Sequence, residues 1–347
     1  MSGTTRADFG RRSSSMVNAP VVRAAARAVA LTSLYGFACH ALAQGDSGDA
    51  APEIGVLPVQ GNIYMLVGPE SNVTIQVGNE GVLVVDTMGT AMAEALLAAI
   101  QGITDKPITF VVNTHAHPDN VGGNAVLAEA GSNIAGGNVV GTIADAGATA
   151  RVVAHENALI AITATDDPLP FEGWPTDTYF TGHKDLFFNG EAVRVLHQPA
   201  AHTDGDSIVF FRRSDVIATG DIFLTTTYPY IDRAAGGSFQ GIIDSLNRIL
   251  DMAVPADRQE GGTMIVPGRG RLSDEADVLE YRDMLTIIRD RIRYLVDQGM
   301  SLDEVLDARP TLDYDGRYGA DSGPWTTEQF IEAVYEELRE SAGAAAG

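Results

Sequence analysis

The sequence predicts a mixed protein of the α+β or α/β class, in which two β-sheets are each covered on the outside by helices. Two β-rich stretches, which begin at Asn62 and Asp185, are separated by helical and irregular segments. Helix-like segments follow each stretch, and further helices fill the last quarter of the chain. Because strands and helices do not alternate regularly, two covered sheets fit the pattern better than one parallel βαβ array.

The first half is predicted to be a series of short strands with two helices between them. Ile63, Met65 and Val67 alternate with other residues, as in a half-buried strand. Residues 71–87 are expected to form two strands joined by a turn at residues 79–81. The other predicted segments are a helix over 92–103, a buried strand over 108–114, a helix over 125–131, a surface excursion over 132–149 and a strand over 150–156.

The second half has the same character and ends in helices. Residues 185–199, 207–221 and 263–268 are β-rich. Ser301 and Glu304 have the spacing of a capping box, which predicts the start of a helix. Apolar residues at helical spacing predict helices over 238–253, 274–298, 301–308 and 326–339.

Residues 1–43 are predicted to be a signal peptide. Arg23 and Arg27 precede an apolar stretch over residues 28–38, and Ala41-Leu42-Ala43 has the small-x-small pattern of a cleavage site. The stretch is too short for a transmembrane helix, so a periplasmic or secreted protein is expected. Three alternatives stay open at this end of the chain: a start at Met16, a twin-arginine signal at Arg11-Arg12 and a lipid anchor at Cys39.

The chain that follows divides into three parts. Residues 44–57 are polar and are expected to form a mobile leader. Residues 58–272 contain the predicted strands and form one β-rich domain. Residues 273–347 are expected to be a C-terminal helical extension packed on that domain.

The composition excludes several classes of function. The chain has 347 residues and a formal net charge of −23, so its surface repels phosphate groups and nucleic acid is not an expected partner. The single cysteine excludes a disulfide framework and a cysteine-based metal cluster. Beyond the signal peptide no apolar run of about eighteen residues occurs, so no integral membrane segment is expected. A small-molecule substrate remains the expected partner, and the oligomeric state is left open.

The segment NTHAHPDNVGGN, residues 113–124, carries the strongest chemical signal. It follows a predicted buried strand, and in extended backbone the side chains of residues i and i+2 point the same way. His115 and His117 can therefore direct two imidazoles at one ion, with Asp119 beside them. Two glycines then let the chain turn tightly into a helix.

Three further strand ends add polar residues to the same set. His202 in AAHTDGD, Asp221 in TGD and Arg269 in PGRG each follow an apolar strand. Three histidines with an open fourth position form a catalytic type of zinc site. Such a site lowers the pKa of bound water to about 7 and so provides a nucleophile at neutral pH.

These motifs resemble those of the metallo-β-lactamase superfamily. HAHPDN is similar to the family pattern H-x-H-x-D-H, and PGRG stands where the family usually has PGHG. The resemblance covers roughly residues 58–270. It implies a four-layer αβ/βα sandwich, in which two mixed β-sheets are flanked by helices and metals bind at one edge. It also implies that His115, His117, His202 and Asp221 are metal ligands.

Two departures from the family pattern fall on the second of the family's two metals. Position 120 is asparagine instead of histidine, and position 269 is arginine instead of histidine. Arginine cannot lose its proton in a protein and therefore cannot be a ligand. The hypothesis is a degenerate second site, in which Arg269 pairs with Asp119 or Asp221 and replaces the charge of the second ion. A plain structural ion pair at Arg269 is the alternative.

The expected activity is that of a secreted, metal-dependent hydrolase with one zinc ion, iron being the other metal considered. The water on the metal would attack an ester, thioester, lactone or lactam carbonyl. Asp119 would orient that water or take its proton, Asn120 would donate a hydrogen bond, and Arg269 would bind a substrate carboxylate or an oxyanion. The alternatives are a mononuclear iron oxygenase of the same fold and a non-catalytic relative that binds metal or ligand.

The other polar and aromatic residues near these motifs have simpler interpretations. His155 and His197 are expected to be hydrogen-bonded neighbours of the site, and His183 is expected to be exposed. Asp204 and Gly205 are expected to form a turn. The aromatic residues considered are Tyr228 and Tyr230, as pocket lining or as packing, and Trp174 and Trp325, as anchors of loops and terminal helices.

Overall fold

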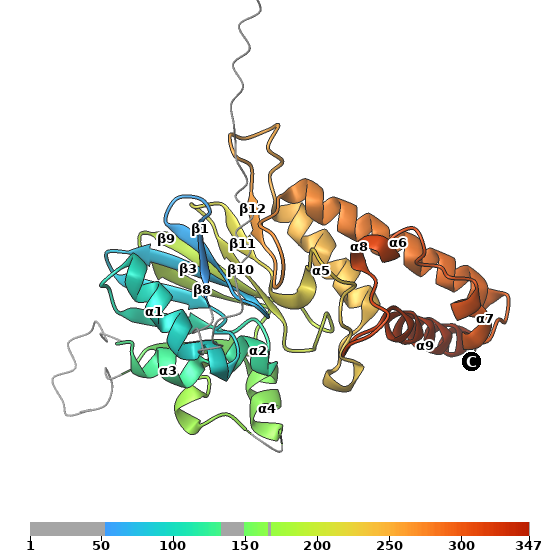
Figure 1. Ribbon diagram of the computed structural model, residues 1–347, viewed down its shortest axis with the longest axis horizontal. Coiled ribbons are helices and arrows are strands. Elements are labelled where there is room, and N and C mark those ends of the chain that lie inside the picture. The colour runs from blue at the N-terminus through green and yellow to red at the C-terminus, as the bar shows by residue number, and fades with distance from the viewer. Residues whose placement is uncertain (1–52, 133–148, 166–167, 347) are drawn as a thin grey trace, which may run out of the picture. The chain divides into compact units, whose positions relative to one another are not determined.

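The structure is a computed structural model that describes residues 53–132, 149–165 and 168–346 (Figure 1). The predicted signal peptide over 1–43, most of the leader over 44–57 and all but the ends of the excursion over 132–149 lie outside the described residues. None of the described helices is both long enough and apolar enough to cross a bilayer.

The first sheet has seven strands in the order β1 to β7. The strands β1 to β4 pair in antiparallel fashion, and β4 to β7 pair in parallel. Their bounds are β1 Gly55–Pro58, β2 Ile63–Val67, β3 Asn72–Gly78, β4 Gly81–Val85, β5 Ile108–Val112, β6 Arg151–His155 and β7 Asp177–Tyr179.

The second sheet has five strands in the order β12-β11-β10-β9-β8. The strands β8 to β11 are antiparallel, and β11 and β12 are parallel. Their bounds are β8 His183–Phe188, β9 Glu191–His197, β10 Ser207–Phe211, β11 Val216–Ala218 and β12 Met264–Val266.

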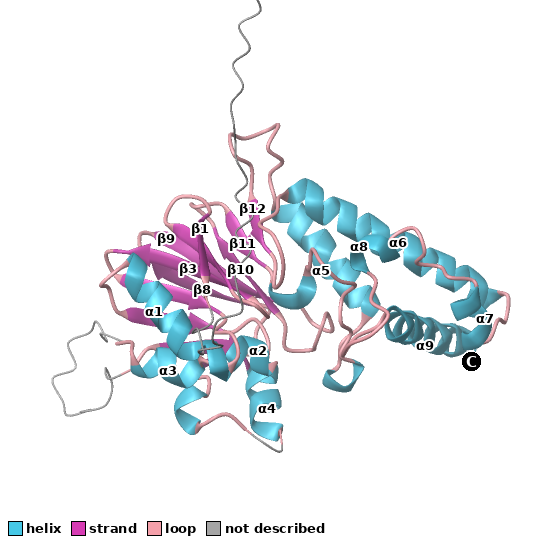
Figure 2. Ribbon diagram, viewed as in Figure 1, coloured by secondary structure: helices cyan, strands magenta, loops and turns pink. Residues whose placement is uncertain are grey.

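Helices cover the outer faces of both sheets, as Figure 2 shows. On the first sheet they are η1 Thr90–Met92, α1 Ala93–Ile103, α2 Pro118–Val121, α3 Asn124–Glu129, α4 Glu156–Ala164 and η2 Phe171–Gly173. With the second sheet and the C-terminal part they are η3 Gly220–Ile222, η4 Arg233–Ala235, α5 Phe239–Met252, α6 Glu275–Asp297, α7 Leu302–Asp307, α8 Asp315–Tyr318 and α9 Thr327–Ala346.

Three hydrophobic clusters separate four layers, and they follow from the alternation of side chains along the strands. In β4, Leu83 and Val85 belong to the cluster between the sheets, whereas Val82 and Val84 belong to the cluster under α1 and α3. The third cluster lies between the second sheet and helices α5, α6 and α9. The predicted four-layer αβ/βα sandwich is thereby confirmed.

Side-chain caps begin three helices of the second half, α5, α6 and α7. Ser238 accepts the backbone N–H of Gly241 at the start of α5. A capping box opens α6 at Asp274, and the box predicted at Ser301 and Glu304 opens α7. Helix α5 also lies very close to the loop before His202, since a Cβ on Gly241 would stand 1.7 Å from the carbonyl oxygen of Ala200. Only glycine permits this approach.

Most elements lie within a few residues of their predicted bounds, but five strands and α-helices were not predicted. These are β1, which takes up the last residues of the expected leader, together with β7, α2, α4 and α8. Helix α4, ENALIAITA, is apolar on almost every side and so lacks the periodicity that indicates a helix.

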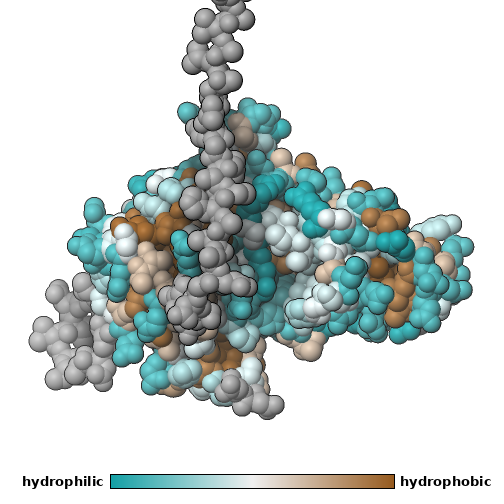
Figure 3. All heavy atoms as spheres, in the orientation of Figure 1, coloured by the Kyte–Doolittle hydropathy of each residue, from teal (hydrophilic) through white to brown (hydrophobic). Residues whose placement is uncertain are grey.

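The face in Figure 3 is largely hydrophilic outside its grey segments, as the net charge of −23 leads one to expect.

Phe330 in α9 tests the packing of the C-terminal helices. Its side chain is fully buried and stacks on Tyr228 with ring centroids 4.5 Å apart. Replacing it with alanine leaves a cavity, so Phe330→Ala should lower the free energy of unfolding by about 3–5 kcal/mol. Denaturant unfolding measures the change. Phe180→Ala is the control, since Phe180 is 75% exposed and its loss should change the free energy of unfolding by less than about 0.5 kcal/mol.

Candidate metal centre

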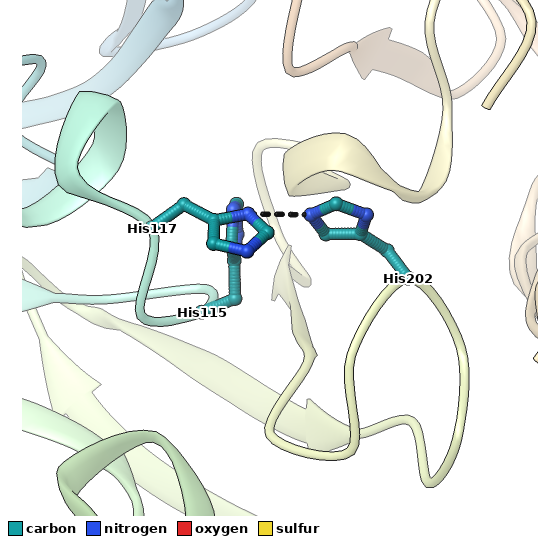
Figure 4. Close-up of side chains that lie close together, drawn as sticks. All are labelled: His115, His117 and His202. Carbon is teal, nitrogen blue, oxygen red and sulfur yellow. Dashed lines mark hydrogen bonds between the residues drawn. The ribbon is translucent and has the colours of Figure 1, made fainter. Parts of the chain in front are cut away.

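Three histidines from two loops converge at one edge of the sandwich (Figure 4). His115 and His117 lie between β5 and α2, and His202 follows β9. One ring nitrogen from each lies within 4.8 Å of the others, and the ring centroids are 4.7 to 5.0 Å apart. Within the described residues this is the one group of three or more histidine, cysteine or carboxylate side chains close enough to hold an ion.

Each histidine has an inner ring nitrogen, which faces the other two histidines, and an outer one. The outer nitrogen of His115, Nδ1, is held by a chain of hydrogen bonds. In its ionised form Asp86 accepts the hydroxyl proton of Thr114 at 2.8 Å, and the Thr114 oxygen then accepts a hydrogen bond from Nδ1 of His115 at 3.0 Å. This arrangement places the proton of His115 on Nδ1 and leaves Nε2 unprotonated, so that Nε2 accepts from Asn120 in this structure and could offer the same lone pair to an ion at the centre. Burial lowers the pKa of His115 well below its usual value, and the neighbouring His202, His117 and Arg269 lower it further.

The outer nitrogens of His117 and His202 also contact acceptors. Nδ1 of His202 donates to the backbone carbonyl of Tyr230 at 2.7 Å, and Nε2 of His117 donates to the Asp232 carboxylate at 2.9 Å. A carbonyl or carboxylate oxygen accepts only, so each of these nitrogens must carry a proton. Carboxylates and carbonyls that hold histidines in this way are typical partners of metal ligands.

The contact between the two inner nitrogens then requires a positive charge. Nε2 of His202 lies 2.9 Å from Nδ1 of His117, and in neutral rings both are lone pairs without a proton. A cation between them, either a metal ion or one extra proton, removes this repulsion. Burial lowers the pKa of His202, which disfavours the proton. The residues present therefore fit a metal ion.

Two buried polar atoms in the centre have no partner among the described residues. They are Oδ1 of Asn120 and Oδ1 of Asp221. Buried oxygens of this kind are normally hydrogen-bonded, so an ion or an ordered water is expected beside them. Asn120 is fully buried and donates from Nδ2 to Nε2 of His115 at 3.2 Å. Asp221, in η3, does not belong to the group of three converging ligands within the described residues.

Arg269 lies between the two carboxylates that follow the family's second-metal pattern. Its Nη2 atom pairs with Asp119, and the same atom is 3.5 Å from the Asp221 carboxylate. The Asp221 side chain is almost fully buried, and that of Asp119 is mostly buried. The guanidinium thus supplies a fixed positive charge between two buried acidic groups, beside the three histidines.

Two further buried carboxylates hold the loops that carry the histidines. Asp86 accepts hydrogen bonds from the backbone N–H and the hydroxyl of Thr114, each at 2.8 Å. Asp206 accepts the backbone N–H of Thr203 at 2.8 Å and its hydroxyl at 3.0 Å. Burial raises the pKa of Asp86 to about 8, against the opposing effect of the Thr114 hydrogen bonds. Each of the two loops that carry the histidines is therefore held by one buried carboxylate, which accepts two hydrogen bonds from it.

A cavity of about 900 Å³ lies beside the centre. His117 and Asp232 contribute to its wall, together with apolar residues of α4 and of the segment 168–170. The side chains of Asp119, Asn120, Asp221 and Arg269 do not line it. The cavity therefore meets the centre on the side of His117 and Asp232.

The other histidines among the described residues, His155, His183 and His197, lie outside the ligand group. His155 and His197 stack with ring centroids 3.6 Å apart, and burial, followed by the neighbouring His197, lowers the pKa of His155 to about 4. His183 is exposed, and Asp204 and Gly205 form the expected turn.

The aromatic residues noted in the sequence have separate surroundings. Tyr228 is buried packing, whereas Tyr230 lies 5.9 and 5.6 Å from the rings of His117 and His202. Trp325 donates to the carbonyl of Pro229, and Trp174 donates to that of Leu169.

Asp86, Asp206 and Asp232 position the site and were not predicted to do so from the sequence. Asp86 directly follows an apolar strand, as Asp221 does, which was the one available signal. Asp232 is 115 residues from His117, and its neighbours in the sequence give no indication of the contact.

Removing the Asp232 carboxylate should weaken metal binding. Without its acceptor, His117 can turn and lose basicity, so Asp232→Ala should reduce zinc affinity by about 10- to 100-fold. Asp232→Asn keeps an acceptor oxygen, so its zinc affinity should lie between that of the wild-type chain and that of Asp232→Ala. Competition with a chromophoric chelator measures the affinity. Asp283→Ala, at a mostly exposed surface carboxylate, should leave the affinity unchanged. Equal affinities for all three variants would mean that Asp232 does not orient His117.

Comparisons with known proteins identify the family. The sequence profile of the Metallo-beta-lactamase superfamily matches residues 66–270. The linear primary-alkylsulfatase of Pseudomonas sp. (strain ATCC 19151) is 25% identical over an alignment of 260 residues, and the match covers 66% of this chain and 48% of the alkylsulfatase. The metallo-beta-lactamase type 2 of Bacillus sp. (strain 170) is 22% identical over 219 residues, 62% of this chain and 73% of that protein.

Solved structures show the same fold at low sequence identity. An inverting sec-alkylsulfatase from Pseudomonas sp. matches with a TM-score of 0.59 and 15% identity, over 82% of this chain and 50% of that chain. The metallo-beta-lactamase from Pontibacter korlensis matches with a TM-score of 0.50 and 17% identity, over 67% and 99%. The chain spans about half the length of the alkylsulfatases it matches. Since the profile covers more than half of the sequence, the chain belongs to the metallo-β-lactamase superfamily.

Proposed function

We propose that the chain is a hydrolase with one zinc ion, which acts on an ester, thioester, lactone or lactam carbonyl. The observation that carries the proposal is the pairing of Arg269 with Asp119 and Asp221 beside three converging imidazole nitrogens. The histidines keep a full set of nitrogens for one ion. Asp119 and Asp221, the two carboxylates at the position of the family's second metal, are already paired with the positive charge of Arg269.

The residues around the ion would each have one task. A zinc ion on His115, His117 and His202 supplies a bound water with a pKa near 7. Asp119 is partly accessible and keeps one oxygen outside its ion pair, so it can orient a water or accept a proton. Asp221 keeps its unpartnered Oδ1 for the same water.

Arg269 is suited to a developing negative charge. A guanidinium has five N–H donors, and both of its ion pairs here use the single atom Nη2. Its side chain is 39% exposed, so the other donors remain accessible to a substrate oxygen. Donors placed in advance around an oxyanion are a large source of catalytic rate.

Sulfate ester hydrolysis is a second candidate, and the likeness to two alkylsulfatases favours it. Its substrate carries a negative charge, which the zinc ion and Arg269 would attract and which Asp232, on the cavity side of the centre, opposes. A carbonyl ester is neutral and meets no such opposition. Turnover of p-nitrophenyl acetate and p-nitrophenyl sulfate by the zinc-loaded chain compares the two directly.

Metal content is the direct test of the proposal. Elemental analysis of the dialysed protein should find one zinc per chain, and His117→Ala should lose both the zinc and ester turnover. Two tightly held ions per chain would contradict the role given to Arg269. Iron together with oxygen uptake would favour the oxygenase alternative. One zinc without turnover of any ester, thioester, lactone or lactam would favour a non-catalytic relative.

Restoring the two missing histidines should restore a second ion. The double variant Asn120→His and Arg269→His supplies both absent ligands beside Asp119 and Asp221, so its content should rise to about two zinc ions per chain. Each single variant should stay at one, because the other half of the site is still lacking. If the double variant gains no metal, Arg269 does not occupy the place of the second ion.

A further inference from the structure

The cavity beside the metal centre has a mostly apolar wall built on helix α4. Ala158, Ala161 and Ile162 face it from the helix, with Val121 and Leu169 from other segments. Its volume of about 900 Å³ lies in the upper part of the range for small-molecule sites. A substrate group the size of acetyl would leave most of this space unfilled.

The apolar wall is attached firmly to the loop that carries His202. Gly205 packs against α4 so closely that a Cβ there would stand 2.9 Å from the backbone nitrogen of Ala158. Asn157 donates from its side chain to the carbonyl of Asp204 at 3.1 Å. The wall therefore has a set position relative to the histidines, as a substrate subsite requires.

The charged side chains of the wall are all acidic. Among the described lining residues they are Asp204 and Asp232, and no lysine or arginine is present. Arg269, the cation of the centre, does not line the cavity. Such a wall attracts no anionic group and favours the transfer of an uncharged apolar group out of water.

We infer that this cavity holds an uncharged apolar chain of the substrate, while the scissile carbonyl lies at the metal centre. The inference rests on the proposed hydrolase function and adds the substrate class to it. The substrates are then esters or thioesters with an uncharged acyl chain of several carbons, rather than short chains or chains that carry a negative charge.

A series of p-nitrophenyl esters tests the length of the chain. Each methylene that leaves water should raise kcat/KM by up to about fourfold. The octanoyl ester should therefore exceed the acetyl ester by more than tenfold with the zinc-loaded full chain. The suberoyl monoester, which has a carboxylate at the far end of the same chain, should lose this gain. Equal kcat/KM for acetyl and octanoyl esters would overturn the inference.

Two tryptophan variants of α4 localise the effect. Ala161 lines the cavity, whereas its neighbour Ile160 is 62% exposed and does not line it. Ala161→Trp should narrow the cavity next to α4 and lower the ratio of kcat/KM for the octanoyl ester to that for the acetyl ester. Ile160→Trp should keep the preference. If the two variants behave alike, the chain does not bind in this cavity. If Ala161→Trp unfolds at a lower temperature than the wild-type chain, Leu169→Asp repeats the test, because it places a charge in the wall of the same cavity.

Binding of an uncharged fluorescent probe separates this inference from the proposed function. N-phenyl-1-naphthylamine should brighten with the wild-type chain and with Ile160→Trp, but not with Ala161→Trp. Probe binding of this pattern without any ester turnover would reject the hydrolase and support the apolar subsite. Ester turnover without probe binding would retain the hydrolase and overturn the subsite.

Discussion

The position of Thr114 determines the geometry of the metal centre. Its backbone N–H and hydroxyl bind Asp86 at the end of β4, and its oxygen accepts Nδ1 of His115. Its carbonyl accepts the N–H of Ser207, the first residue of β10 in the other sheet. One residue thus joins the two sheets where the histidine loops meet. Because Asp86 is buried, a lost bond would leave an unpaired polar group at high cost.

A guanidinium and a second zinc ion answer the same electrostatic need in different ways. Asp119 and Asp221 both lie within reach of Nη2 of Arg269 and are largely buried, so without a cation their negative charges would repel each other. A metal provides that charge only while it is bound, and it adds open coordination positions. Arg269 provides the charge permanently and adds hydrogen-bond donors instead. With the one-zinc function proposed above, the centre would exchange a second Lewis acid for a fixed anion-binding group.

Local patterns were sufficient for the ligands but not for the groups that hold them. His115 and His117 follow a buried strand at spacing i, i+2, and Arg269 cannot ligate, so both inferences needed only neighbouring residues. The partnership of Asp232 with His117 depends on two loops meeting in the folded chain. The fold class followed from strand alternation, whereas α4, without periodicity, was not predicted. The apolar subsite is built on that helix and so could not be anticipated.

The C-terminal helices contribute to the metal centre through one loop. In the loop between η3 and η4, the carbonyl of Tyr230 accepts a hydrogen bond from Nδ1 of His202, and the carboxylate of Asp232 accepts one from Nε2 of His117. Trp325 donates to Pro229 and packs edge-on against Tyr230 with ring centroids 4.8 Å apart. Two of the three imidazoles are therefore oriented by a segment whose own position depends on the helices after α6. A domain that lacked those helices would keep the three histidines and both acceptors in its sequence but would lose the contacts that position the acceptors.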